Sequence, residues 1–316
     1  MGDLSMTEED AVNPAQPAHA SAAADPAPTR PDGPAWARLL PRAEQEHAER
    51  VAAAIGEPER LGVAFSGGVD STVLLALAAR ALGPARTLAV LGVSPSLAAS
   101  ERAAAHDLAA DLGTPLVEVR TFEGANAAYR ANGPDRCFHC KHELFARISD
   151  TVAQAYGLTA VAYGENADDA RRRDRPGSAA ARDHAVLRPL AEAGLDKAAV
   201  RSVARAMGLR NADKPAAPCL ASRIPHFEDV TPQKLAQVEA AERAVAALGF
   251  ADCRVRHHGE VARLELPAVD LARAVTEPIR EQLLAGVRAA GFRFVALDLA
   301  GVQSGAFTLP LVAGDG

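Results

Sequence analysis

The sequence has no long apolar run, few aromatic residues and no excess of basic charge. No stretch approaches the roughly 18 apolar residues that cross a membrane, so we expect no membrane partner. A net charge of −6 and an aromatic content of 4% offer little surface for a phosphate backbone or for stacked bases. Nucleic acid is therefore not the expected partner. The N-terminus also lacks the basic and apolar segments of a secretory signal, and we expect a reducing cytoplasm.

Cysteine is scarce, and its placement is informative. Cys137 and Cys140 form a C-x-x-C pair, which we expect just before a helix starting at Lys141, and Cys219 lies far along the chain. Without an export signal, closely spaced cysteines indicate metal binding or catalysis more than disulfides. We interpret Cys253, in an alternating stretch, as structural.

Several chemistries fit three such cysteines. Three thiolates could hold three irons of a [4Fe–4S] cluster and leave the fourth iron open. Zinc would need a fourth ligand, with His139, His142 or His226 as candidates. A redox dithiol would not explain Cys219. The remaining alternative is three unrelated cysteines that are buried as small apolar side chains.

The order of apolar segments predicts an α/β protein. Residues 1–33 have almost no large apolar side chains, so we predict a disordered tail. Strands that alternate with helices over residues 34–225 predict a parallel sheet with helices on both faces. Residues 226–316 predict a smaller α+β domain. The expected strands are 61–65, 88–93, 115–119, 160–163, 254–256, 261–266 and 292–299, and the expected helices are 36–55, 72–82, 101–112, 141–156, 195–207, 231–248 and 279–290.

A glycine-rich loop connects the first expected strand to the next helix. The loop is Ser66-Gly67-Gly68-Val69-Asp70-Ser71. Its glycines permit a positive φ and let backbone amides approach phosphate oxygens, and a helix starting near Ser71 would direct its positive end at them. Ser66 and Ser71 can donate hydroxyl groups, and Asp70 can help to hold Mg²⁺. The Walker and G-x-G-x-x-G patterns are both absent.

The loop resembles that of the ATP-pyrophosphatase (PP-loop) superfamily. The resemblance implies a Rossmann-like adenine nucleotide alpha-hydrolase fold. It also implies an enzyme that adenylates a carbonyl or carboxyl oxygen with ATP and releases pyrophosphate. The loop alone does not select the substrate.

Further segments resemble one family of this superfamily, the LarE family of ATP-dependent sulfurtransferases in nickel-pincer cofactor synthesis. The likeness covers roughly residues 40–308. Glu165, where the family usually has Thr, and His226-Phe227 depart from its pattern. The matching segments are 136–141 (R-C-F-H-C-K), 166–169 with 174–177, 214–223, 254–259, and 297–299 with Ser304-Gly305.

This resemblance implies a reaction and a set of site residues. ATP would activate the carboxylates of pyridinium-3,5-biscarboxylic acid mononucleotide, and sulfur would displace AMP to give thiocarboxylates. Sulfur would come from a [4Fe–4S] cluster held by Cys137, Cys140 and Cys219, or from Cys219 itself as a sacrificed reagent. The further residues implied are Lys141 at a phosphate, Glu242 in the active site, and Arg223, Arg254 and Arg256 at a nucleotide phosphate. Asp168 and Asp169 are either Mg²⁺ ligands or a capping pair for the segment that follows them.

The resemblance also implies a homo-oligomer, with the C-terminal domain in substrate binding or assembly. Nickel-inserting and racemase-type enzymes would act downstream. Three alternative functions remain. A tRNA thiolation enzyme would need to bind an extended phosphate backbone, and an ammonia-using amide synthetase would need no cysteines. The third alternative is a non-catalytic zinc or nucleotide-sensing module.

Overall fold

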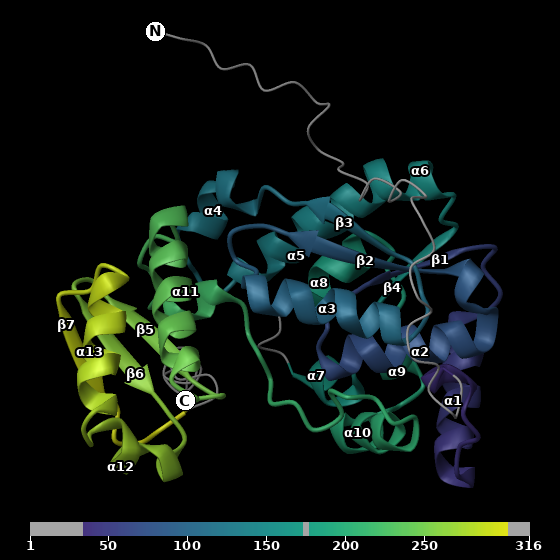
Figure 1. Cartoon of the computed structure of the whole chain (residues 1–316). Coiled ribbons are helices and arrows are strands. Elements are labelled where there is room, and N and C mark those ends of the chain that lie inside the picture. The colour runs from purple at the N-terminus through teal and green to yellow at the C-terminus, as the bar shows by residue number, and fades with distance from the viewer. Residues whose placement is uncertain (1–33, 173–176, 303–316) are drawn as a thin grey trace, which may run out of the picture. The chain divides into compact units, whose positions relative to one another are not determined.

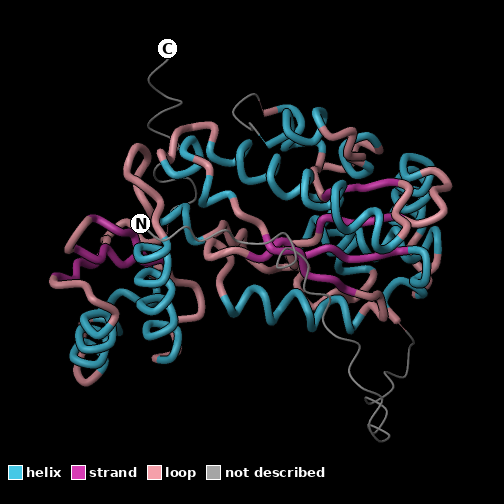
Figure 2. Tube along the Cα trace, turned by 90° about the horizontal axis from the view of Figure 1, so that it is seen from above, coloured by secondary structure: helices cyan, strands magenta, loops and turns pink. Residues whose placement is uncertain are grey.

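The computed structural model describes residues 34–172 and 177–302. The predicted disordered tail, the 174–176 part of one family motif and Ser304-Gly305 lie outside the described residues. The chain forms two compact units, which we describe separately (Figures 1 and 2). Unit 1 comprises residues up to 94, 99–122 and 137–217, and unit 2 comprises 95–98, 123–136 and residues from 218 onward. The boundary predicted near residue 225 treats each domain as one continuous segment, whereas unit 2 also takes in two short segments from the first half of the chain.

Unit 1 is built on a parallel sheet of order β3-β2-β1-β4. Because β2 and β3 lie on one side of β1 and β4 lies on the other, the strand order reverses between β1 and β4. Ligands of open α/β sheets bind at the carboxyl ends of strands next to such a reversal. The strands are β1 (Leu61–Ala64), β2 (Thr87–Val93), β3 (Leu116–Arg120) and β4 (Ala160–Tyr163).

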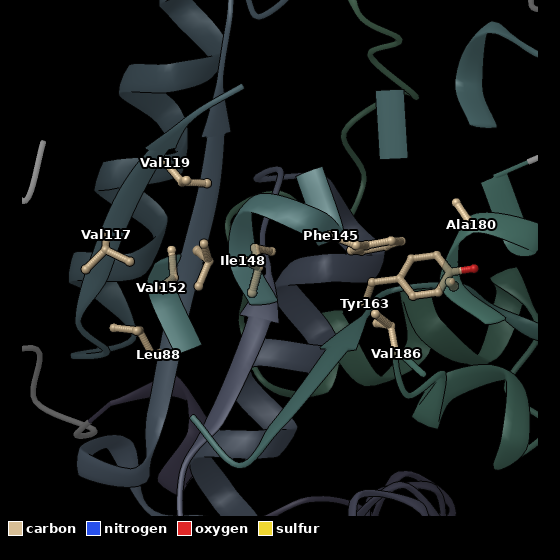
Figure 3. Close-up of a cluster of buried hydrophobic side chains, with 11 residues drawn as sticks. Leu88, Val117, Val119, Phe145, Ile148, Val152, Tyr163, Ala180 and Val186 are labelled. Atoms are coloured by element: carbon tan, nitrogen blue, oxygen red, sulfur yellow. The ribbon is translucent and has the colours of Figure 1, made fainter. Parts of the chain in front are cut away.

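Helices cover both faces of this sheet, as predicted. On one face, Leu88 and Val90 of β2 belong to a buried apolar cluster that also contains Phe145 and Ile148. Figure 3 shows this cluster. Side chains alternate along a strand, so the buried Ala89 and Leu91 face the opposite side. The helical segments of unit 1 are η2 (Ala35–Ala37), α1 (Arg42–Ile55), α2 (Val69–Leu82), η3 (Pro84–Arg86), α3 (Ala99–Asp111), α5 (Arg136–Arg147), the π-helix Ile148–Val152, α6 (Ala153–Tyr156), α7 (Ala167–Arg171), α8 (Gly177–Asp183), α9 (Pro189–Glu192) and α10 (Lys197–Ala206).

Three predicted helix starts are wrong. The helix expected from residue 36 begins at Arg42, and the other two concern the site. Helix α5 begins at Arg136, so Cys137 and Cys140 lie within the helix instead of before it. Helix α2 begins at Val69 with Gly68 as its N-cap, so Asp70 and Ser71 belong to the helix. In both places the chain has few strongly apolar residues, and hydrophobic periodicity shows a helix start poorly there.

Unit 2 combines a small mixed sheet with two long helices, which matches the predicted α+β class. Strand β5 (Arg254–His258) runs antiparallel to β6 (Val261–Glu265), and β7 (Phe294–Leu297) runs parallel to β6. The core lies between the sheet and helices α11 and α13, and includes Val255, Leu264 and Phe292. Its helical segments are η4 (Glu123–Ala125), α4 (Ala127–Arg130), η6 (Leu220–Arg223), α11 (Pro232–Ala247), η7 (Ala268–Asp270), α12 (Leu271–Ala274) and α13 (Ile279–Ala289).

None of the helices in the described part of the chain is both long enough and apolar enough to cross a membrane.

Candidate active site

The glycine-rich loop follows β1, at the carboxyl edge of the unit 1 sheet. Gly67 has φ +71°, which side chains other than glycine rarely adopt. A Cβ on Gly67 would also lie 3.3 Å from the Cα of Ala105 in α3. The loop therefore requires glycine at this position for its conformation and tolerates little added bulk.

Hydrogen bonds within the loop fix its shape. The Ser66 and Ser71 hydroxyl oxygens lie 3.2 Å apart, and the Ser71 hydroxyl donates to the carbonyl of Gly68 at 3.0 Å. Outside the loop, the Asn211 amide donates to the Gly67 carbonyl at 3.0 Å and to the Thr72 hydroxyl at 2.9 Å. These bonds hold the loop carbonyls in place. The first amides of an α-helix have no intrahelical partner, so those of α2 are suited to bind an anion.

Asp70 lies between an amide and an ammonium group. Its Oδ1 accepts from Asn166 Nδ2 at 3.3 Å, and its Oδ2 lies 2.5 Å from Lys197 Nζ. Asn166 Nδ2 also donates to Asp169 Oδ2 at 3.1 Å. Two carboxylates thus meet at one amide group beside the loop, and carboxylate oxygens are ligands that Mg²⁺ prefers. The donor set fits a magnesium ion held against phosphates.

Asp168 is held by α10 and α7. Its Oδ2 accepts from the backbone N–H of Lys197 at 3.0 Å, and its Oδ1 lies 3.3 Å from Arg171. These contacts orient Asp168 near the start of α10, next to the residue that binds Asp70. Sequence reasoning missed Lys197, Asn166 and Asn211 as loop partners. No sequence pattern indicated that Lys197 would bind Asp70 or that Asn211 would bind the loop. Both contacts arise because α10 and the turn after it pack against α2.

Gly164 brings the end of β4 close to the loop. A Cβ on Gly164 would lie 2.7 Å from the backbone nitrogen of Ser71 and 2.8 Å from the carbonyl carbon of Asp70. Only glycine therefore lets the segment that carries Asn166 approach the start of α2 so closely.

Lys141 also reaches this edge of the sheet. Its ammonium nitrogen lies 4.4 Å from the ring centroid of Tyr163, the last residue of β4. Tyr163 pairs in register with Ala64, the last residue of β1. The structure thus places the Lys141 ammonium at the strand ends from which the loop starts.

The cysteines of unit 1 form a pair on one helix turn. Cys137 is exposed and Cys140 is half-buried, and residues three apart in a helix share a face. Cys219, exposed, is the N-cap of η6 in unit 2. In the described residues, no three His, Cys, Asp or Glu side chains are grouped as a metal ion would require. The donor chemistry fits an iron–sulfur cluster, while the described geometry provides only the Cys137–Cys140 pair.

In unit 2, three arginines cluster with two glutamates. Glu242 Oε1 accepts from Arg223 Nε at 2.8 Å and from the backbone N–H of Val255 at 2.9 Å. Glu265 binds Arg256 through two hydrogen bonds, at 2.9 and 2.7 Å, and is fully buried.

Arg254 lies on the same strand as Arg256, two residues before it, and is 5% exposed. Burial, followed by the neighbouring charges of Arg223 and Arg256, lowers the pKa of the Arg254 guanidinium. A nearby negative charge stabilises the charged form of such a group.

Cys253 lies in different surroundings from the other cysteines. Burial, and after it the charge of Glu242, raises the pKa of its thiol to about 12. The thiol sulfur lies 3.7 Å from the Glu242 carbonyl oxygen. Such a thiol stays protonated at neutral pH and is a poor nucleophile or metal ligand.

Comparisons with known proteins agree with this geometry. A family model described as asparagine synthase matches residues 44–135, which include the glycine-rich loop. The chain is 40% identical over 250 residues to an uncharacterized protein of Synechocystis, covering 79% of this chain and 92% of that protein. It is 34% identical over 253 residues to the pyridinium-3,5-bisthiocarboxylic acid mononucleotide synthase of Lactiplantibacillus plantarum, covering 80% of this chain and 90% of that enzyme.

Two findings lead to one assignment. The glycine-rich loop follows a strand of a parallel sheet, and the chain is 34% identical to most of the Lactiplantibacillus plantarum synthase. The chain belongs to the LarE family of ATP-dependent sulfurtransferases within the PP-loop superfamily.

Proposed function

We propose that this enzyme adenylates the carboxylates of pyridinium-3,5-biscarboxylic acid mononucleotide and replaces each with a thiocarboxylate. The observation that carries the proposal is the Ser66–Ser71 loop, held by Asn211 and Asn166 at the carboxyl edge of β1 and β4. The name of the Lactiplantibacillus plantarum relative supports the choice of substrate.

The proposed first step uses unit 1. A carboxylate oxygen attacks the α-phosphorus of ATP, and pyrophosphate leaves with the electron pair of the broken P–O bond. Amides at the start of α2 bind the leaving phosphates. Asp70, with Asp168 nearby, would hold a Mg²⁺ ion, which would neutralise phosphate charge. Lys141 adds a positive charge at the same edge. The product is an acyl adenylate, whose carbon is now open to attack because AMP is a good leaving group.

Unit 2 supplies the proposed grip on the substrate phosphate. Arg254 is suited to direct contact with a phosphate oxygen, while Glu265 holds Arg256 in a fixed orientation beside it. Glu242 orients Arg223 in the same way. A guanidinium that is already held in place loses little side-chain entropy when it binds an anion.

The proposed second step is attack by sulfur on the activated carbon, with AMP leaving. We propose that Cys137, Cys140 and Cys219 hold a [4Fe–4S] cluster, which would supply a labile sulfide. The presence of all three thiols, and the placement of two of them on one turn of α5, support this. The alternative is that Cys219 gives up its own sulfur, which its exposure permits.

The adenylation step is tested by pyrophosphate release. We expect release from ATP that depends on the pyridinium substrate, and we expect Ser66→Ala to reduce it. The buried Thr114 of unit 1, whose hydroxyl donates to the local carbonyl of Ala109, offers a control in Thr114→Ser. Release that is independent of the pyridinium substrate would contradict the proposal.

The source of sulfur is tested by anaerobic purification, iron and sulfide analysis, and intact mass after turnover. Iron with an unchanged protein mass supports the cluster. Loss of one sulfur from the protein contradicts the cluster and supports sacrifice of Cys219. Salt-sensitive, tight tRNA binding would favour the rival tRNA thiolation enzyme. We also propose, from the family alone, a homo-oligomer and downstream nickel-inserting and racemase-type enzymes.

A further inference from the structure

We propose that Asn211 is a positioning residue for the phosphates of ATP, because it fixes the peptide bond between Gly67 and Gly68 so that the Gly68 amide faces the bound anion. The orientation of this peptide rests on contacts within unit 1. Its consequence for ATP rests on the proposed binding of phosphate by the loop.

Asn211 is buried against the loop, in the turns that follow α10. It is 5% exposed, and its side-chain amide donates to the Gly67 carbonyl at 3.0 Å and to the Thr72 hydroxyl at 2.9 Å. Arg201 of α10 holds these turns, because its guanidinium donates to two backbone carbonyls just beyond Asn211, at 2.9 and 3.1 Å. The helix therefore fixes the position of the donor that reaches the loop.

The chemistry of the partners sets the direction of these hydrogen bonds. A carbonyl oxygen can only accept, so the group of Asn211 that faces Gly67 is its NH₂. The Thr72 hydroxyl donates to the Gly68 carbonyl at 2.9 Å, so it accepts from Asn211. The Oδ1 atom of Asn211 is buried and has no hydrogen-bond partner among the described residues. Because an unpaired buried acceptor costs stability, we infer that this amide serves the loop as a donor.

The bond from Asn211 to Gly67 also sets the direction of the next amide. In a trans peptide, the C=O of one residue and the N–H of the next point in opposite directions within one plane. Asn211 holds the Gly67 carbonyl on the buried side, so the Gly68 N–H points to the other side. Its contact there, with Ser66 Oγ at 3.4 Å, is solvent-exposed. That distance exceeds the usual range of about 2.7–3.2 Å, so an anion can readily replace this contact.

The backbone alone does not fix this orientation, because both residues of the peptide are glycine. Glycine adopts positive and negative φ about equally well, and Gly67 has φ +71°. A half-turn of the peptide plane would exchange the two groups and direct the Gly67 carbonyl oxygen at the anion. Asn211 opposes this half-turn, since the turned peptide would leave one of its buried amide hydrogens without an acceptor.

This role of Asn211 predicts a selective effect on ligands. In the proposed first step the amides at the loop bind the leaving pyrophosphate, so a turned peptide should weaken the binding of pyrophosphate and of ATP. AMP lacks the leaving pyrophosphate, and its affinity should change little. A residue that only supported the fold of the site would affect all three ligands.

Calorimetry on the full-length protein, with Mg²⁺ and either inorganic pyrophosphate, ATP or AMP, tests this selectivity. We expect Asn211→Leu, which removes the donor, to weaken the binding of pyrophosphate and ATP about tenfold and that of AMP less than twofold. Asn211→Ala repeats the measurement if leucine is too large for the buried position and the variant fails to fold.

Thr87→Val is the matched control. Thr87 is fully buried in unit 1, and its hydroxyl donates to the Gly83 carbonyl at 3.1 Å. It is the first residue of β2 and therefore lies at the amino end of the sheet, away from the loop. The control removes a buried hydrogen bond to a glycine carbonyl, and we expect it to bind all three ligands as the unsubstituted protein does.

A crystal structure of the ligand-free Asn211 variant tests the peptide directly. We expect the Gly67 carbonyl to be turned or to occupy two orientations, and a single unchanged orientation would overturn the inference. Unchanged pyrophosphate affinity, or an equal loss for pyrophosphate and AMP, would also overturn it. If the unsubstituted protein binds AMP but neither pyrophosphate nor ATP, the role proposed for the loop fails, and the role of Asn211 in ATP binding fails with it even where the peptide turns.

Discussion

Lys197 Nζ lies 2.5 Å from Asp70 Oδ2, although 127 positions separate the two residues in the sequence. The contact joins the first turn of α10 to the first turn of α2. It fixes the carboxylate that we propose to hold Mg²⁺ beside the phosphates of ATP.

Removing this ammonium group should impair the use of ATP. We expect Lys197→Ala to lower kcat/KM for ATP about tenfold, since a charge-assisted hydrogen bond contributes roughly 1.5 kcal/mol or more and about 1.4 kcal/mol corresponds to a factor of ten in rate. Pyrophosphate release at varied ATP concentration measures it. Lys234→Ala, which breaks the pair with Glu228 in unit 2, is the control. A change of less than twofold in Lys197→Ala would show that the pair does not support ATP use.

Removing one partner of the Arg256–Glu265 pair should strongly reduce the stability of the fold. Their side chains are 3% and 0% exposed. Glu265→Ala would leave a buried guanidinium without its carboxylate, and we expect a loss of about 3–5 kcal/mol in the free energy of unfolding. Urea denaturation measures this loss.

Arg42→Ala serves as the comparison for that measurement. Its pair with Glu46 is 94% and 61% exposed, and exposed pairs contribute little. Equal losses in Glu265→Ala and Arg42→Ala would contradict the structural role of the buried pair.

The cysteines should differ in reactivity towards iodoacetamide. With a pKa raised to about 12, Cys253 is almost entirely protonated at pH 8, whereas an ordinary thiol with a pKa near 8.5 is partly ionised. We expect peptide mapping of the native, cluster-free protein to show rapid modification of the exposed Cys137 and Cys219, and little of Cys253. Rapid modification of Cys253 at pH 8 would contradict its assignment as a structural thiol.

Glu118 should make stability depend on pH. A hydrogen bond from Arg102, opposed by burial and reinforced by a hydrogen bond from His106, lowers the pKa of its carboxyl group. A depressed folded pKa stabilises the fold above the ordinary carboxyl value of about 4.3, and this stabilisation is lost as the pH falls through the folded value. We therefore expect Glu118→Gln to cost roughly 1 kcal/mol at pH 7, because Arg102 is half-exposed.

Unfolding in urea at several pH values checks this dependence. The difference between Glu118→Gln and the unsubstituted protein should shrink as the pH falls below about 4. A difference that stays constant down to pH 3 would show that the carboxylate charge does not produce the effect.

Local sequence patterns determined the elements and the loop chemistry of this protein. The short apolar run before Gly67 and Gly68 predicts a buried strand. Ser66–Ser71 predicts an anion-binding turn, because glycine backbone freedom and helix-end amides are local properties. The parallel α/β sheet and the smaller α+β unit follow from the alternation of strands and helices. Helix starts are less well determined by the sequence. Hydrophobic periodicity predicts a helix from Lys141, whereas α5 begins at Arg136 and includes Cys137 and Cys140.

Only the tertiary structure decided which side chains meet. Lys197 reaches Asp70, and Lys141 reaches Tyr163, because strand order and helix packing bring distant segments together. The sequence predicts the same role for Arg254 and Arg256. In the structure Arg256 pairs with the buried Glu265 of the neighbouring strand, and burial together with the charges of Arg223 and Arg256 lowers the pKa of Arg254. Such differences arise from desolvation and from charges brought close by folding, neither of which a residue's own sequence neighbours specify.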